Sequence, residues 1–421
     1  MSSSLKILVS GSGIAGSVFA HWMLRAYPKA NITIVERAPA LRLTGASVDL
    51  RSSAVDIMKW MGAEEEIRKN TTNEAGMQYV RSNGSEIGTL GATGRTDIQS
   101  ITSEFEIFRG ALAEIFIRPL MKRVKLVFND YISAFEQDDT GVTVTFANSK
   151  QQQKYDLLVA ADGWTSKIRG LMLNTNPREQ VHDEGIHVAY FTIKKDLLNG
   201  SNLAKWYNTT GGRCILVRPD PHPEGRVRAH FMNVRWRNDT AARDKFDAAV
   251  DKGQEAYKDL MEAEFKDAGW IAKDLIKGMR ECDDFYCSLF AQTRSPKLQS
   301  GRVVLLGDAG YATPGMGTSL AIMGAYTLAG DLMSSGFDTT TALKTYEERM
   351  QPFVKSQQGD DNAMQLLNPQ TRWGLTIRNT LLYIVLGLKL DRLAMLTAAK
   401  LGFTEKKLDM PDYAWPAEQA E

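Results

Sequence analysis

Six residues near the N-terminus have the types and spacing of a phosphate-binding turn. A short apolar strand over residues 7–10 leads into Gly11-Ser12-Gly13-Ile14-Ala15-Gly16, and a second strand over 32–35 ends on Glu36 and Arg37. Gly11 permits the tight turn from strand to helix, Gly13 lets the backbone approach a pyrophosphate, and Gly16 lets the helix pack closely on the sheet. Glu36 can accept hydrogen bonds from a ribose hydroxyl. The pattern predicts a βαβ unit that binds a dinucleotide, with the pyrophosphate at the N-terminus of a helix over 14–26.

Two more motifs follow predicted strands. The apolar run 157–161 ends on Asp162-Gly163-Trp164-Thr165-Ser166-Lys167-Ile168-Arg169, and the run 303–306 ends on Gly307-Asp308. Both runs are short and continuously apolar, as buried parallel strands are. Open α/β sheets bind ligands at the carboxyl ends of their strands, where the carboxylate of Asp308 can accept hydrogen bonds from polyol hydroxyls. Asp162-Gly163 is the weaker signal of the two, because Asp-Gly turns are common.

Composition and charge narrow the class of protein. With 421 residues the chain is long enough for two domains or one interleaved domain, and its 43% hydrophobic and 24% charged content are ordinary for a globular protein. A net charge of +1, without a basic stripe, argues against a nucleic-acid partner. The start of the chain does not have the pattern of a signal peptide. Three sparse cysteines fit a reducing, cytoplasmic location, and no Cys or His spacing indicates a metal site.

The most apolar late stretch covers residues 381–388, between Arg378 and Lys389. It is far shorter than the about 20 apolar residues that cross a bilayer, so no integral membrane segment is expected. We interpret the stretch as part of a packed C-terminal helix, with attachment to a membrane surface as the less favoured alternative.

Periodicity divides the chain into two kinds of structure. Buried strands and helices, including helices over 54–69 and 109–122, are typical of one part, and antiparallel strands followed by amphipathic helices are typical of the other. The second kind has expected strands at 185–194, 213–218 and 226–237 and helices at 241–250 and 254–267. The sequence therefore predicts an α/β fold with a discontinuous dinucleotide-binding domain (1–75, 102–180 and 280–365), a mixed β-sheet domain that interrupts it (76–101 and 181–279), and a C-terminal helical segment (366–421).

In their types and order, these motifs resemble those of the class A flavoprotein monooxygenases of the para-hydroxybenzoate-hydroxylase type. The likeness covers residues 5–360 and implies a Rossmann-like FAD-binding domain of the GR2 type. The form of the segment Gly45-Ala46-Ser47-Val48-Asp49-Leu50-Arg51 is similar to the tetracycline-inactivating and polyketide-modifying branch. Many members have a histidine where this chain has Tyr311, but a tyrosine can also donate a hydrogen bond there.

The resemblance implies a role for each motif. Asp308 would hold the ribityl chain of FAD, Arg109 would contact the phosphate and ribityl region, and Asp162-Gly163 would serve both the flavin and the nicotinamide nucleotide. An Arg109 side chain that points to solvent remains an alternative. The loop before the predicted helix 317–334 would bring bare backbone to the flavin ring, and the positive helix end would stabilise the anionic reduced flavin. This loop is Pro314-Gly315-Met316-Gly317-Thr318.

The implied reaction is the insertion of one oxygen atom into an organic, aromatic or polyketide-like substrate. In the family, NADPH or NADH reduces FAD, O2 adds to it as a C4a-hydroperoxide, and the distal oxygen is transferred, so no protein nucleophile is needed and no catalytic residue is assigned. A single dinucleotide fingerprint implies that the nicotinamide binds transiently. A reductase or oxidase of the same fold and a non-catalytic flavin-fold binding protein are the alternatives. The oligomeric state stays open, with a monomer as the default.

Substrate is expected between the middle sheet and the flavin, since domain interfaces offer apolar pockets with few polar anchors. Arg213 and His230 are the expected anchors, with a structural role equally weighted for each, and Met232 is an expected wall residue. Asp49 is a further candidate for substrate binding, although a surface ion pair between Asp49 and Arg51 is an equal alternative.

Overall fold

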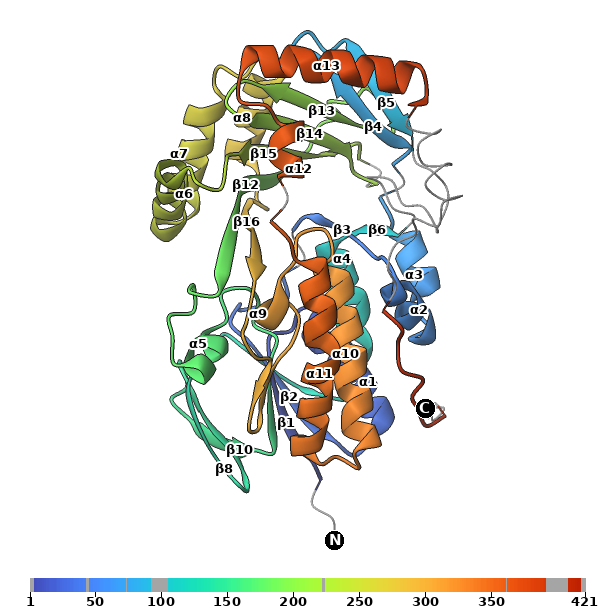
Figure 1. The fold of residues 1–421 in the computed structure, drawn as a ribbon, viewed down its shortest axis with the longest axis vertical. Helices are drawn as coiled ribbons and strands as arrows, with labels where there is room; N and C mark the ends of the chain where they lie inside the picture. The colour runs from blue at the N-terminus through green and yellow to red at the C-terminus, as the bar shows by residue number, and fades with distance from the viewer. Residues whose placement is uncertain are drawn as a thin grey trace.

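The computed structural model describes residues 4–42, 45–72, 74–91, 105–221, 224–360, 362–390 and 408–417. The molecule is elongated, with one large β-sheet in each half (Figure 1). Two strands, β12 (Val181–Ile193) and β16 (Tyr286–Thr293), extend between the halves. Those parts of the predicted ranges that fall at 92–104 and 391–407 lie outside the described residues.

One half has the predicted Rossmann-like layout. Its sheet has the order β17-β18-β11-β1-β2-β7, parallel throughout except for the edge strand β17. The glycine turn follows the central strand β1, as the sequence predicts. The strands are β1 (Lys6–Ser10), β2 (Asn31–Glu36), β7 (Lys125–Phe128), β11 (Leu157–Ala160), β17 (Gln299–Ser300) and β18 (Val303–Leu305).

Helices cover this sheet. α1 (Ile14–Ala26) and α10 (Gly317–Ser334) have the predicted bounds and pack side by side, with α11 (Thr339–Gln357) against α10. The predicted helix 54–69 is two helices, α2 (Ser53–Trp60) and α3 (Glu64–Lys69), because Gly62 between them adopts a φ of +69°. The predicted helix 109–122 is shorter: α4 (Arg109–Ile117) gives way to a 3-10 turn that contains Pro119, which has no N–H for a helical hydrogen bond.

Smaller elements complete this half. β8 (Ile132–Asp138), β9 (Gly141–Phe146) and β10 (Gln152–Tyr155) form an antiparallel sheet of three strands. β3 (Ser47–Asp49) pairs with β6 (Glu106–Phe108) in a two-stranded ribbon that faces the other half. Two short helices, α5 (Lys167–Leu173) and α9 (Asp308–Tyr311), follow the strand ends that carry the second and third motifs.

The other half is a seven-stranded sheet with the order β16-β12-β15-β14-β13-β4-β5. One face of the sheet packs against α6 (Thr240–Lys252), α7 (Gln254–Phe265) and α8 (Ala272–Glu281). β13, β16 and α8 are not predicted from the sequence, and β16 falls in a range assigned to the dinucleotide-binding domain although it pairs with β12 here. The remaining strands are β4 (Gly76–Val80), β5 (Glu86–Gly91), β13 (Leu203–Thr209), β14 (Arg213–Pro219) and β15 (Val227–Val234).

The C-terminal helices lie on this half. α12 (Ala363–Leu367) is short, and α13 (Arg372–Gly387) crosses the sheet at the end of the molecule (Figure 1). The prediction that the stretch 381–388 is helical and packed is confirmed for one side of the helix, where Leu382 and Leu386 pack against the sheet, although no residue of α13 is fully buried. One side of α13 contacts the sheet and the other faces outward. Within the described residues, no helix combines the length and apolarity that a bilayer span requires.

Candidate functional site

The glycine turn contains glycines of two kinds. Gly11 has a φ of +108°, and a Cβ there would overlap the carbonyl oxygen of Ala161; a Cβ on Gly16 would overlap the carbonyl oxygen of Gly11. Gly13 differs, because a Cβ there would meet no protein atom within 4 Å. Gly13 lies at the start of α1, where it borders a cavity together with Ile14 and Ala15. The first and third glycines are therefore needed by the protein itself, and the second leaves open space beside free helical N–H groups.

Glu36 stabilises this turn. Its Oε2 accepts hydrogen bonds from the backbone N–H of Ser12 at 3.1 Å and from the Ser12 hydroxyl at 3.0 Å, and its Oε1 accepts one from the N–H of Ala38 at 2.9 Å. Glu36 and the neighbouring Arg37 border the part of the cavity nearest to β2. The carboxylate thus fixes the loop from the position at which the sequence predicts a ribose contact.

The cavity consists of three adjoining recesses of about 330, 150 and 110 Å³ that share Gly13, Arg109 and Gly163 in their walls. It extends from the end of β2, past the glycine turn, to the gap between the two halves of the molecule. All three sequence motifs border it, so the structure brings together segments that are up to about three hundred residues apart. A long, multipart ligand fits this shape better than a compact one.

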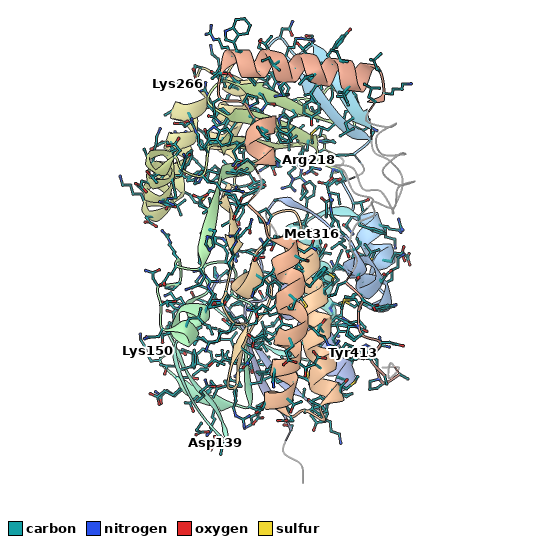
Figure 2. All side chains as sticks on the ribbon, viewed as in Figure 1. Asp139, Lys150, Arg218, Lys266, Met316 and Tyr413 are labelled. Atoms are coloured by element: carbon teal, nitrogen blue, oxygen red, sulfur yellow. The ribbon has the colours of Figure 1, made fainter. Side chains whose placement is uncertain are left out.

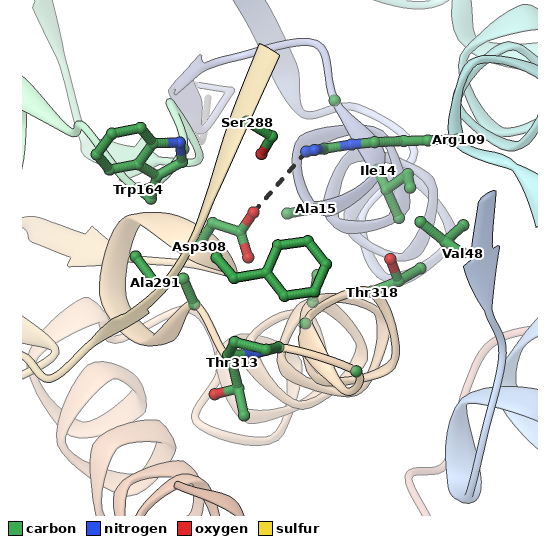
Figure 3. Close-up of a pocket in the computed structure, with 18 of the residues that line it drawn as sticks. Ile14, Ala15, Val48, Arg109, Trp164, Ser288, Ala291, Asp308, Thr313 and Thr318 are labelled. Carbon is green, nitrogen blue, oxygen red and sulfur yellow. Dashed lines mark ion pairs between the residues drawn. The ribbon is translucent and has the colours of Figure 1, made fainter. Parts of the chain in front are cut away.

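Asp308 and Arg109 face each other across the cavity (Figure 3). Each is the first residue of its helix, and Nη2 of Arg109 lies 3.8 Å from Oδ2 of Asp308. Both side chains are partly exposed, so they can also contact a molecule in the cavity. The alternative that Arg109 points away to solvent is wrong, since its side chain borders all three recesses.

The loop before α10 forms the floor of the largest recess. Pro314, Gly315, Gly317 and Thr318 border it, and Gly315 has a φ of +78° with no atom within 4 Å of the place that a Cβ would occupy. No side chain caps the N-terminus of α10, so its first N–H groups are free to bind a ligand. Met316 does not border the recess; its side chain packs against the core beneath.

Arg169 connects the second and third motifs. It is fully buried and donates to the carbonyl oxygens of Ala309 at 2.7 Å, Trp164 at 2.8 Å and Pro177 at 2.5 Å. The guanidinium therefore fixes the Asp162-Gly163 turn against α9, which carries Asp308. Burial raises the pKa of the Asp162 carboxyl, while Ser166 and Arg169 oppose that shift. Trp164 lies at the cavity wall near Asp308 and Ser288 (Figure 3).

Tyr311 does not point into the cavity. Its hydroxyl lies 2.9 Å from the hydroxyl of Tyr346, which in turn donates to the carbonyl of Leu305 at 3.1 Å. Gly324 of α10 makes room for this ring, because a Cβ there would overlap the Tyr311 hydroxyl. The tyrosine therefore joins α9 to α10 and α11 in the core.

Three of the four predicted substrate residues, Asp49, His230 and Met232, lie on the side of the molecule that faces the cavity, but only Asp49 borders the largest recess. Asp49 borders the largest recess and pairs with Arg51 at 2.9 Å, and both side chains are mostly buried, so this is not a surface ion pair. His230 borders a small recess behind the ribbon β3–β6, beside Tyr190. Burial, together with the charges of Arg218 and Arg228, lowers the pKa of His230 well below its ordinary value. Met232 packs with Tyr190 and Tyr286 on the same side of the sheet.

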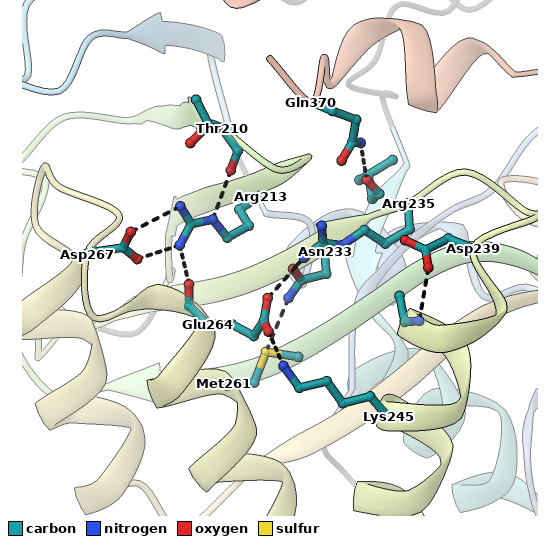
Figure 4. A network of polar contacts seen from close by, with 12 residues as sticks. Thr210, Arg213, Asn233, Arg235, Asp239, Lys245, Met261, Glu264, Asp267 and Gln370 are labelled. Carbon is teal, nitrogen blue, oxygen red and sulfur yellow. Dashed lines mark hydrogen bonds and ion pairs between the residues drawn. The ribbon is translucent and has the colours of Figure 1, made fainter. Parts of the chain in front are cut away.

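Arg213 is the exception. Its side chain lies on the helix-covered face, where it donates to Asp267 at 2.6 Å and to the carbonyl of Glu264 (Figure 4). Side chains alternate between the faces of a strand, and Arg213 shares the face of Ile215 and Val217, which pack against the helices. The expectation that Arg213 anchors a substrate in the cavity is therefore corrected.

The arginine on the cavity side of β14 is Arg218, which sequence reasoning missed. It lies between the two halves (Figure 2) and pairs with Glu74 at 2.5 Å, with Glu106 of β6, and with the Ser47 hydroxyl of β3. Burial raises the pKa of the Glu74 carboxyl against the opposing effect of Arg218. The position of Arg218 five residues after Arg213, with the opposite strand parity, is the signal that could have found it.

Several other wall residues were also missed. Tyr286, Ser288 and Phe290 of β16 border the largest recess, as does Trp164. The three aromatic residues within 285–291, a residue type enriched in strands, are a signal that could have found the first three. Within the part of the chain that the structure describes, no three or more His, Cys, Asp or Glu side chains form a group that could hold a metal ion.

Comparison with known proteins bears on this site. Residues 4–358 match the model of a family described as FAD binding domain. The chain is 31% identical to Monooxygenase CTB7 of Cercospora beticola over 98% of both chains, and 32% identical to the flavin-dependent monooxygenase eupH of a Phoma species over 97% of this chain and 98% of that one.

Solved structures that share the architecture include the following two. The tetracycline destructase Tet(51) matches with a TM-score of 0.75 at 25% identity, covering 98% of this chain and all 100% of that one. Klebsiella pneumoniae HpxO in complex with FAD and uric acid matches with a TM-score of 0.68 at 20% identity, covering 94% of this chain and 97% of that one, which is a likeness of fold.

Proposed function

This chain belongs to the FAD-binding-domain family and is a class A flavoprotein monooxygenase, and on that premise we propose that it uses NADPH or NADH and O2 to insert one oxygen atom into an aromatic or polyketide-like substrate. The observation that carries the proposal is the cavity that joins the glycine turn, Asp308 and the uncapped N-terminus of α10. The likeness to Tet(51), a tetracycline destructase, supports a fused-ring substrate.

The residues that border the cavity fit FAD. Gly13 and Gly315 leave open the places that a Cβ would fill, and free N–H groups begin both α1 and α10. The turn at Gly13 would hold the pyrophosphate, Asp308 and Arg109 the ribityl chain, and residues 314–318 the ring. When bound, FAD supplies hydride acceptance from the nicotinamide and activation of O2 for oxygen transfer.

The protein's own contribution is positioning, charge and the exclusion of water. The N-terminal N–H groups of α10 would stabilise negative charge at the ring edge nearest to Gly317. Val48 and Phe290, which both border the largest recess, would limit access of water. Asp49, which borders the largest recess, is the proposed polar contact of the substrate. His230 borders only the separate small recess, so we assign it the structural role that was its alternative, as a ring that burial keeps neutral at pH 7.

The three cysteines bear on the location of the protein. We propose a reducing compartment such as the cytoplasm, which is supported by Cys214, Cys282 and Cys287 all being free thiols.

The test uses the purified full-length protein. We expect visible flavin absorbance that bleaches on addition of NADPH or NADH and recovers with O2, and a screen of phenolic and polyketide compounds should find one that stimulates oxidation of the nicotinamide. Under ¹⁸O2 the product should contain one labelled oxygen atom. Product reduced without O2 uptake would indicate a reductase, O2 uptake without any labelled product would indicate an oxidase, and protein that stays colourless in excess FAD would refute the proposal.

A further inference from the structure

α13 presents a continuous apolar stripe on the outer side of the molecule. Successive members are four, four, three and four residues apart, which places them on one helical face about 22 Å long. Single exposed apolar side chains are ordinary, but a contiguous row marks an interaction surface. The members and their exposed fractions are Trp373 80%, Ile377 58%, Leu381 57%, Ile384 43% and Leu388 67%.

The helix is fixed with this stripe outward. On the opposite face, Leu382 and Leu386 pack against the cluster of Met77 and Ile87 in the sheet. Leu386 lies directly over β5, where Gly88 has no side chain to hold it away. The guanidinium of Arg378 lies 5.8 Å from the ring centroid of Tyr79. α13 therefore cannot turn to bury the stripe without losing these contacts, and Figure 2 shows its outer side chains extending away from the molecule.

The charges around the stripe indicate which kind of partner would bind to it. From residue 362 to residue 390 the chain has three cations, Arg372, Arg378 and Lys389, and no Asp or Glu. Arg372 and Lys389 are exposed at the two ends of the stripe. Trp373 at one end and Tyr383, 60% exposed, beside the stripe are the aromatic types that favour the boundary between lipid and water.

We propose that α13 docks this protein on an anionic lipid surface. A second copy of the chain fits less well: antiparallel pairing of two stripes would bring Arg372 of one copy beside Lys389 of the other, and parallel pairing would bring identical cations together. The helix supplies no acidic group to compensate either arrangement. An anionic bilayer supplies the missing negative charge and accepts the apolar row at the same time. The inference does not depend on the proposed oxygen transfer.

The experiment is co-sedimentation of the full-length protein with vesicles of phosphatidylcholine alone or mixed with phosphatidylserine. The wild type should bind the mixed vesicles, and the double variant I377D/L381D should bind at least about tenfold less. Arg372→Glu with Lys389→Glu leaves the stripe intact, so it should weaken binding to the mixed vesicles and remove its dependence on salt. Leu171→Asp on α5 is the matched control, because Leu171 is also an exposed leucine, at 44%, but lies in the other half.

Flavin content and thermal midpoint establish that each variant is folded. The proposal is overturned if the wild type does not bind either kind of vesicle, if I377D/L381D binds as the wild type does, or if the charge variant binds the mixed vesicles as the wild type does. It is also overturned if light scattering shows a wild-type dimer that I377D/L381D converts to a monomer, since a second copy would then be the occupant.

Discussion

At the scale of single residues, the glycines of the turn differ in whether the fold or a ligand requires them. Gly11 and Gly16 approach backbone carbonyl oxygens too closely to carry a side chain, so the fold requires them. Gly13 borders all three recesses and has no protein neighbour at the place of a Cβ. The packing of the described residues would therefore allow a side chain at Gly13, and a ligand in the cavity would not.

Gly13→Val tests this distinction. We expect the variant to fold with nearly the thermal midpoint of the ligand-free wild type, yet to retain little FAD, because its side chain would occupy the place of the pyrophosphate. The measurement is flavin absorbance per protein together with a melting curve. Gly16→Val is the control and should lose stability in the absence of FAD. A Gly13→Val protein with full flavin content would contradict the assignment.

Asp308 should dominate the polar contacts of the cofactor. A hydrogen bond to a charged group contributes about 1.5–3 kcal/mol, so Asp308→Ala should weaken FAD binding roughly ten- to hundredfold. Asp308→Asn should be milder, since its amide keeps one acceptor oxygen. Titration of the FAD-stripped protein, followed by flavin fluorescence, gives the affinities. Asp283→Ala, which removes an exposed carboxylate paired with Lys194, should bind FAD as the wild type does; equal affinities for all three variants would exclude the role.

At the scale of elements, the sequence predicts those helices and strands whose formation depends on the pattern of neighbouring residues. α1 and α10 have the predicted bounds because their hydrophobic periodicity and their glycine-rich starts agree. β16 escapes prediction because its pairing partner, β12, lies about a hundred residues earlier, so its own pattern carries little of the information. The three motifs all border the cavity because each follows a parallel strand, a rule that needs no knowledge of long-range packing.

The error at Arg213 has a different physical origin. The alternation of β14 is visible in the sequence, but which face meets the cavity depends on where α7 and α8 pack. Those helices take the face of Ile215 and Val217, and Arg213 goes with it. The opposite face brings Arg218 to the ribbon β3–β6, which carries Asp49. Site residues that depend on this choice could not be assigned from spacing alone.

The two arginines of β14 form a matched pair for experiment. Arg218→Met leaves Glu74 and Glu106 buried without a partner and should cost about 3–5 kcal/mol of unfolding free energy. It should also alter the bound-flavin spectrum or the KM for substrate, because the ribbon beside the cavity loses its connection to the sheet. Arg213→Met should be less destabilising, since Asp267 is mostly exposed, and should leave the spectrum and KM unchanged. Urea denaturation and steady-state kinetics measure both effects, and a spectral change in Arg213→Met alone would reverse the assignment.

On the scale of the whole molecule, the cavity lies where the two halves meet, and residues of both halves border it. The six-stranded half contributes the glycine turn, Asp308 and the start of α10, and the other half contributes β16. A ligand in the cavity therefore contacts both halves, and its binding energy adds to the stability of the whole chain. The unfolding free energy that the chain has without a ligand must therefore be measured on FAD-free protein.

The protein itself should lose stability in acid through two histidines, the half-buried His21 in one half and the buried His187 in the other. Burial, with Arg25 and Arg123, lowers the pKa of His21 from 6.5 to about 4, and burial with Arg235 does the same for His187. The folded-state pKa lies below that of the unfolded chain, so the unfolded chain binds more protons between pH 6.5 and about 4. The stability is complete above pH 6.5 and is lost as pH falls through that window, by about 2 kcal/mol per histidine between pH 7 and pH 5.

His21 is the better of the two for a test. Near His187, Asp183 has a pKa raised to about 6 by burial, and that group favours the folded state as pH falls, which opposes the effect of the histidine. His21 lies on α1 with its Nε2 buried and unpartnered, so a side chain that cannot titrate replaces it without loss of a hydrogen bond. His21→Phe should reduce the difference in unfolding free energy between pH 7 and pH 5 by about 2 kcal/mol.

Urea denaturation of the FAD-free protein at the two pH values measures that difference. His182→Phe is the control, since His182 is exposed at the start of β12, and it should keep the wild-type difference. If His21→Phe and wild type lose the same free energy on acidification, His21 is protonated in the folded protein at pH 5. Among the described residues, the charges that lower the pKa of His21 are those of Arg25 and Arg123, both positive, so a protonated ring there would need a negative partner.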